Sequence, residues 1–167
     1  MKHPAALASD QLLTECDVRF TRRSGPGGQN RNKVETAAIL THRPTGLSAE
    51  ANERRSQSQN REVALFRLRL LLAIEVRVQR EPGAMPGRLW QSRCVAGRIL
   101  INPKHDDFPA ILAEALDFLD RENGDLRAAG EALGCTMSQL TRFLKQEPRA
   151  FAAINRRRQS LGLRPLL

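Results

Sequence analysis

The feature that most limits how this chain can fold is a β-hairpin followed directly by a long helix. Residues 34–42 are rich in β-branched and apolar side chains, and residues 47–52 have the composition of a returning strand. Between them, Pro44 and Gly46 stand where a type I turn prefers them. A capping-box sequence and apolar residues at helical spacing then predict a helix over residues 56–78. The pattern predicts an α+β fold, with a small antiparallel sheet packed on a long helix.

Two further elements precede the hairpin, and a strong break follows the helix. Residues 7–13 predict a short helix, and residues 17–23 alternate as a strand does. Two prolines and two glycines within residues 81–87 end the helical pattern. We therefore predict a first domain over residues 1–80 and a linker over residues 81–105, part of which shows no clear secondary-structure pattern.

The last part of the sequence, residues 106–167, predicts an all-helical C-terminal unit. A helical pattern begins at residue 107 and stops at residues 123–124, and two short helices follow. These two helices resemble a helix-turn-helix, with Ala129 as the small residue, Gly134 in the turn and Leu140 in the core. Such a unit could contact nucleic acid, or it could be a three-helix packing unit that contacts nothing.

The charge of the chain favours a polyanionic partner. Its 27 lysines and arginines exceed its 18 acidic residues and give a formal net charge of +9. Nucleic acid and an acidic membrane surface are the two partner classes that suit such a surface. No apolar run approaches the length of a membrane span, and residues 1–10 show no export signal. We therefore expect a soluble protein in the cytosol.

Neither a disulfide framework nor a metal site is predicted, because the cysteines and histidines are scattered. These residues are Cys16, Cys94, Cys135, His3, His42 and His105.

One segment, Gly27-Gly28-Gln29, has a composition suited to a reaction. Consecutive glycines permit backbone angles closed to other residues and let a ligand approach the main chain. Gln29 adds a neutral amide beside a backbone N–H that can point at a developing oxyanion. Taken alone, however, such a tripeptide is more often a flexible surface turn.

Four blocks of sequence in one order closely resemble the catalytic domain of class I peptide chain release factors. The blocks are residues 23–29, Asn32-Lys33, residues 42–46, and residues 55–57 with Asn60-Arg61. The resemblance covers roughly residues 17–78. It implies hydrolysis of the ester between peptide and tRNA in the ribosome, without a cofactor, and carries over Gly27, Gly28 and Gln29 as catalytic residues. The implied partners are large-subunit rRNA and peptidyl-tRNA, and a glutamine methyltransferase acting on Gln29 is a further candidate partner.

Two departures from the family pattern shape the expected function. Asn30-Arg31 stands where many family members have His-Val, and only about 16 residues precede the first predicted strand, which leaves no room for a codon-recognition domain. The chain is therefore similar to the short rescue factors, and we expect release from stalled ribosomes without codon recognition. A factor specialised for damaged ribosomes is not distinguished from this. The alternative is a non-enzymatic RNA-binding, ribosome-binding or helix-turn-helix regulatory protein with a vestigial loop.

Basic residues near the loop and in the C-terminal helices are the expected contacts to RNA phosphates. They are Arg22, Arg23, Arg31, Asn32, Lys33, Arg54, Arg55, Arg61, Arg142, Lys145, Arg156, Arg157 and Arg158. Gln139 is a further expected contact on the second helix of the helix-turn-helix. Because the chain has no tyrosine and one tryptophan, duplex or structured RNA is a better partner than a stacked single strand.

Overall fold

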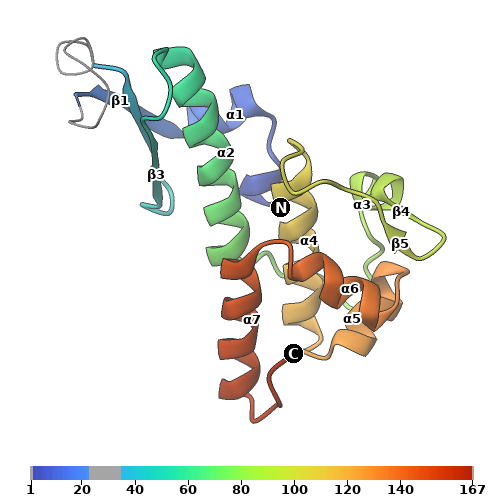
Figure 1. Ribbon diagram of the computed structural model, residues 1–167. Helices are drawn as coiled ribbons and strands as arrows, with labels where there is room; N and C mark the ends of the chain where they lie inside the picture. The colour runs from blue at the N-terminus through green and yellow to red at the C-terminus, as the bar shows by residue number, and fades with distance from the viewer. Residues whose placement is uncertain (1, 23–34, 167) are drawn as a thin grey trace. The chain divides into compact units, whose positions relative to one another are not determined.

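The computed structural model describes residues 2–22 and 35–166. Contacts divide the chain into two compact units, each traced in Figure 1. The sheet unit comprises Leu7–Leu72, and the helical unit comprises Met1–Ala6 together with Ala73–Leu167. The domain limits inferred above, residues 1–80, 81–105 and 106–167, stay predictions.

The sheet unit contains the predicted hairpin. After helix α1 (Ser9–Thr14), strands β1 (Cys16–Thr21), β2 (Ala37–His42) and β3 (Ser48–Ala51) form an antiparallel sheet in the order β1-β2-β3. The apolar side chains of β2 supply the core, because Ala37, Ala38 and Leu40 are buried. The small antiparallel sheet and the α+β fold are thereby confirmed.

Helix α2 (Gln57–Glu75) is the predicted long helix, but it ends three residues before the predicted limit of Val78. The side chain of Arg77 folds back and donates to the carbonyl oxygens of Ala73, at 2.9 Å, and of Ile74. These are carbonyls at the helix C-terminus that no further helical turn satisfies. The apolar residues beyond Glu75 continue the helical spacing, and the sequence pattern therefore extended the helix too far.

The helical unit is built around helix α4 (Phe108–Arg121), which is buried from Phe108 to Leu119. The short 3-10 helix η1 (Pro4–Ala6), helix α3 (Arg88–Arg93) and helix α5 (Leu126–Leu133) pack against it. Aromatic rings fill the core beside it, because Trp90 and Phe108 both contact the ring of Phe143, with centroids 6.1 and 5.4 Å away. Offset and edge contacts of this kind add to the stabilisation from burial.

The remaining elements of the helical unit include two that the sequence patterns did not indicate. The predicted short helices are α5 (Leu126–Leu133) and α6 (Met137–Leu144). The additional elements are the hairpin of β4 (Cys94–Val95) and β5 (Arg98–Ile99), and helix α7 (Pro148–Ser160). None of the helices that the described residues form is long and apolar enough to cross a membrane.

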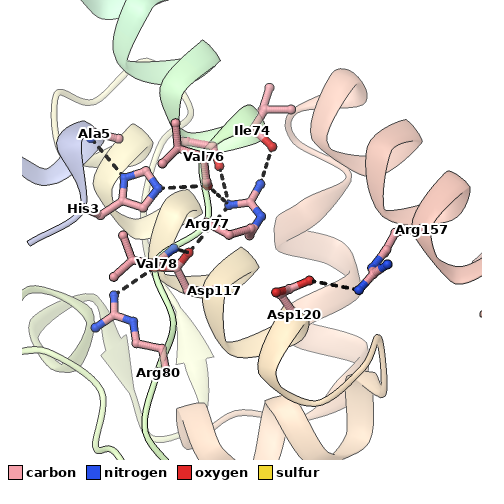
Figure 2. A network of polar contacts seen from close by, with 11 residues as sticks. His3, Ala5, Ile74, Val76, Arg77, Val78, Arg80, Asp117, Asp120 and Arg157 are labelled. Atoms are coloured by element: carbon pink, nitrogen blue, oxygen red, sulfur yellow. Dashed lines mark hydrogen bonds and ion pairs between the residues drawn. The ribbon is translucent and has the colours of Figure 1, made fainter. Parts of the chain in front are cut away.

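Two buried carboxylates of α4 fix the irregular segment that follows α2. Asp117 accepts hydrogen bonds from the backbone N–H of Val78 at 3.0 Å and from Arg80 at 3.2 Å, as Figure 2 shows. Glu114 accepts from the N–H of Gly87 at 2.5 Å, and burial raises the pKa of its carboxyl group. The proline- and glycine-rich segment is therefore held by side chains of α4 at both ends.

His3 ties the start of the chain to the same segment (Figure 2). Its Nδ1 accepts from the N–H of Ala5 at 3.0 Å, and its Nε2 lies 3.1 Å from the carbonyl oxygen of Val76. The proton must therefore sit on Nε2, and the ring is neutral. Burial lowers the pKa of His3, with smaller contributions from Arg77 and Arg80, and outweighs the opposite effects of the Val76 carbonyl and of Asp117.

We expect His3 to make the helical unit sensitive to acid. Since the folded-state pKa lies below the ordinary value of 6.5, the stabilisation is full above pH 6.5 and is lost as the pH falls through the folded-state pKa. Urea unfolding at pH 7.5, 6.5 and 5.5 should show a larger loss of unfolding free energy for the parent protein than for His3→Gln. Equal losses in the two proteins would contradict this assignment.

Candidate functional site

The connection between β1 and β2 carries the predicted catalytic loop. Residues 23–34, which include Gly27, Gly28, Gln29, Arg23, Arg31, Asn32 and Lys33, lie outside the described residues. The ends of the connection are described, and they start from the last β1–β2 pair, Thr21 with Ala37. Beyond this pair, Arg22 and Glu35 form an exposed ion pair at 3.6 Å. Both ends of the connection therefore begin at the same end of strands β1 and β2, which we call the loop end.

A buried amide, that of Asn60, organises the loop end. Its Nδ2 donates to the carbonyl oxygens of Thr36 at 2.6 Å and Arg54 at 2.9 Å, and its Oδ1 accepts from the N–H of Arg54 at 2.8 Å. The side chain is completely buried, and all these polar atoms are paired. Gln57 adds a second bond from α2, to the carbonyl oxygen of Glu35 at 2.6 Å. Helix α2 thus holds the residues that lead into β2.

Four of the predicted RNA-binding arginines belong to the loop end, which the register of the sheet explains. Because Ala51 at the end of β3 pairs with Ala38, the chain after β3 leaves the sheet near the start of β2. Two exposed arginines, Arg54 and Arg55, lie in this segment, and Arg61 lies on the first turns of α2. Arg22, which follows β1, is the fourth.

One further arginine on α2, Arg67, has a structural role. It donates to the carbonyl oxygen of Glu50 at 2.7 Å and to the carboxylate of Glu53. This contact lowers the pKa of Glu53. Glu53 therefore pairs with Arg67, although it directly precedes Arg54 and Arg55 in the chain.

Residues 42–46, the third sequence block, lie at the other end of β2. The buried His42 lies 2.8 Å from Thr45 Oγ1 through Nδ1 and 3.1 Å from Glu15 Oε2 through Nε2. Gly46 adopts a φ of 70°, which favours glycine. Five residue steps along β2 separate this turn from the loop end by about 17 Å. The block therefore builds the hairpin turn, away from the loop end.

In the helical unit, α5 and α6 form the predicted helix-turn-helix. Gly134 begins the turn with a φ of 71°, and Thr136 caps α6 by accepting from the N–H of Gln139 at 3.2 Å. Close approach of the two helices requires a small residue. The structure places Gly130 at this position, one residue after Ala129, which was expected from the sequence. A Cβ on Gly130 would lie only 2.9 Å from the carbonyl oxygen of Cys135.

Gly130→Ala should therefore destabilise the protein. Helix propensity alone would raise the unfolding free energy by about 1 kcal/mol. The clash is with backbone, however, and we expect a net loss of about 1–2 kcal/mol, as overpacking typically gives. Thermal unfolding measures the sign directly, and a raised midpoint would show that α5 and α6 can separate without cost.

The predicted contacts on α6 differ in exposure. Arg142 and Lys145 are exposed, as is Ser138, whereas Gln139 is only partly exposed. Lys145 also lies over the ring of Phe151 at 5.6 Å. The outward surface of the helix is therefore formed by Ser138, Arg142 and Lys145, and Gln139 lies at its margin.

The three consecutive arginines on α7 have different surroundings. Arg156 is exposed, and Arg157 lies 3.7 Å from the carboxylate of Asp120. Arg158 is half-buried and donates to the carbonyl oxygens of Gly124 and of Arg164, the latter at 2.9 Å. A substitution at Arg158 would therefore disturb the C-terminal fold, and Arg156 and Arg157 are the positions that test RNA binding there.

Comparison with protein families identifies the first part of the chain. The RF-1 domain family matches residues 12–91. This part of the chain is an RF-1 domain of the class I release factor family. The RF-1 domain takes in most of the sheet unit, with the β1–β2 connection and Asn60, and continues into α3 of the helical unit.

Peptide chain release factors from several organisms are similar to the RF-1 domain. Peptide chain release factor PrfB1, chloroplastic, of Arabidopsis thaliana is 48% identical over 66 residues, which are 40% of this chain and 14% of the relative. Peptide chain release factor 1 of Streptomyces avermitilis is 45% identical over 82 residues, or 47% and 23% of the two chains. Peptide chain release factor 2 of Thermomicrobium roseum is 42% identical over 78 residues, or 45% and 21%. The matched part is thus less than a quarter of each of these relatives.

Proposed function

We propose that this protein hydrolyses the ester bond of peptidyl-tRNA on stalled ribosomes, without reading a codon. The observation that carries the proposal is an intact Gly27-Gly28-Gln29 sequence in the β1–β2 connection of an RF-1 domain. The substrate is suggested by the relatives, which are named as peptide chain release factors.

The proposed reaction needs few protein groups. The oxygen of a water molecule attacks the ester carbon, the bond to the tRNA ribose oxygen breaks, and a proton from the water ends on that oxygen. The tetrahedral intermediate carries an oxyanion that a backbone N–H can stabilise. We assign this donor to Gln29, with its side-chain amide placing the water and Gly28 allowing the backbone to approach. A charged general base is not part of the proposal.

Residues at the loop end would position the connection in the ribosome. Asn60 and Gln57 hold the carbonyl oxygens of Thr36 and Glu35, and exposed arginines lie at the same end of the sheet. Arginines bind phosphates well because the guanidinium fork matches the phosphate oxygens. We propose that these arginines contact large-subunit rRNA, together with the basic residues within residues 23–34.

Codon independence is the second part of the proposal. We assign catalysis to the RF-1 domain and anchoring to the basic surfaces of α6 and α7, so that within these 167 residues no group is assigned to codon reading. Methylation of Gln29 by a glutamine methyltransferase is a proposed modification of the same loop.

Release of labelled peptide from three kinds of ribosome tests this proposal. Ribosomes would carry peptidyl-tRNA with a stop codon, a sense codon or no mRNA in the A site. Similar rates on all three are expected. Release that strictly requires the stop codon would overturn codon independence, and ribosome binding without release would favour the non-enzymatic alternative.

A further inference from the structure

The outward surface of α6 is exposed in the described part of the helical unit, where Lys145 also contacts the ring of Phe151. Leu140, Phe143 and Leu144 are buried on one side of this helix. The opposite side carries Ser138, Arg142 and Lys145, which follow each other at helical spacing and are exposed. We call these three residues the α6 face.

The β4–β5 hairpin extends the basic surface beside this face. Strand β5 lies against α6, and the hairpin turn lies beside the turn of the helix-turn-helix, since a Cβ on Gly97 would lie 3.9 Å from the carbonyl oxygen of Gly134. Ala96 and Gly97 adopt φ values of 49° and 75°, as a tight two-residue hairpin requires. Arg98, the next residue, is exposed.

Two acidic side chains on elements that adjoin α6 are paired with arginines outside this surface. On α5, Glu131 pairs with Arg127 at 3.2 Å, and before α7, Glu147 pairs with Arg149 at 2.8 Å. Each of these carboxylates is matched by an arginine other than those of the α6 face. Arg142, Lys145 and Arg98 therefore leave the surface positive.

We propose that the α6 face, with the neighbouring β4–β5 hairpin, docks the protein on a duplex stem of ribosomal RNA. Two cations and a hydroxyl suit phosphate and ribose oxygens, which hold a protein on a duplex without reading its sequence. The exposed part of the first turn, Met137 and Ser138, has no side chain that pairs bidentately with a base. Double-stranded RNA is bound mainly through shape, phosphates and 2′-hydroxyls. The choice of RNA rests on the proposed ribosomal function.

The test measures binding of the full-length protein to a fluorescent RNA duplex of about 20 base pairs by anisotropy at several salt concentrations. Arg142→Gln with Lys145→Gln should reduce affinity on the order of tenfold near 0.1 M salt and reduce the salt slope by about 2. The matched control is Arg127→Gln with Arg149→Gln. It removes the same charge from exposed residues that are already paired with glutamates.

Ser138→Glu separates binding from folding. A glutamate in the first turn of α6 suits the helix dipole, so thermal stability should be unchanged or raised. The same charge opposes phosphate, so affinity for the duplex should fall. Unchanged affinity, or an equal loss in the control double variant, would overturn the proposal. A DNA duplex of the same sequence that binds more tightly than the RNA would overturn it as well.

A peptide-release assay distinguishes failure of this docking proposal from failure of the proposed hydrolysis. If Gln29 variants release peptide as fast as the parent, the proposed hydrolysis fails, whereas the duplex measurements still decide the docking surface. If the α6-face variants bind the RNA duplex as the parent does, docking fails whatever the release assay gives.

Discussion

Gln29→Pro is expected to slow peptide release by roughly 100- to 1000-fold, because proline removes the backbone N–H that we assign to the oxyanion. Gln29→Ala keeps this N–H and loses only the amide that places the water, so it should retain more activity than the proline variant. Single-turnover release from stalled ribosomes, with saturating protein, measures both rates.

The control for these variants is Asn30→Ala, which changes the neighbouring residue of the same connection. Its release rate should stay within a few-fold of the parent, and all three variants should bind ribosomes with nearly parental affinity. If affinity falls in proportion to the release rate, the segment is a docking loop and the catalytic assignment is wrong.

Asn60→Ala should lower the unfolding free energy of the protein by about 3 kcal/mol, as expected when three hydrogen bonds of a buried amide are lost. The substitution leaves the carbonyl oxygen of Thr36 and both backbone groups of Arg54 without this partner. Urea unfolding followed by circular dichroism measures the change. The exposed neighbour on the same helix turn provides the control, and Gln59→Ala should cost less than about 0.5 kcal/mol.

Asn60→Ala should also slow peptide release at temperatures where the protein remains folded, since the residues leading into β2 lose the bond from Asn60 of α2 and keep that from Gln57. A loss of stability below about 1 kcal/mol would mean that water replaces the amide and that Asn60 does not organise the loop end.

The hairpin and the long helix could be predicted because their signals are local. Pro44 and Gly46 set the turn, and the β-branched and apolar residues before them set β2. The end of α2 could not be placed from spacing alone, since it depends on one side chain, Arg77, turning back onto the helix carbonyls. The prolines and glycines after α2 predicted a break, but the conformation of that segment could not be predicted, because Glu114 and Asp117, far along the chain, hold it in place.

The candidate site was predictable in part for the same reason. The basic residues near Gly27-Gly28-Gln29 are visible as a cluster in the sequence, whereas Arg54, Arg55 and Arg61 come from later in the chain, and the register of the sheet brings them to the loop end with Arg22. The sequence pointed to Asn60 only as part of a motif. Its structural role could not be predicted, because it depends on hydrogen bonds to Thr36 and Arg54, which the fold brings next to α2. An asparagine on the buried side of the first turns of a helix was the available signal. Gly130 shows its role only through the close approach of the Cys135 carbonyl oxygen across the turn, and Arg158 only through the carbonyl oxygen of Gly124, 34 residues earlier.

The packing of η1 against α4, which is encoded much later in the sequence, has a consequence for folding during synthesis. His3 and η1 belong to the helical unit, and η1 packs against α4, whose residues are translated about a hundred positions later. Residues 7–72 form a compact unit of their own and are translated before α4, so we expect them to fold while the chain is still growing. Helix η1 cannot complete its packing until Phe108–Arg121 has left the exit tunnel. Closing this long chain segment should be the late, slow step of folding, because contacts between residues distant in sequence form slowly.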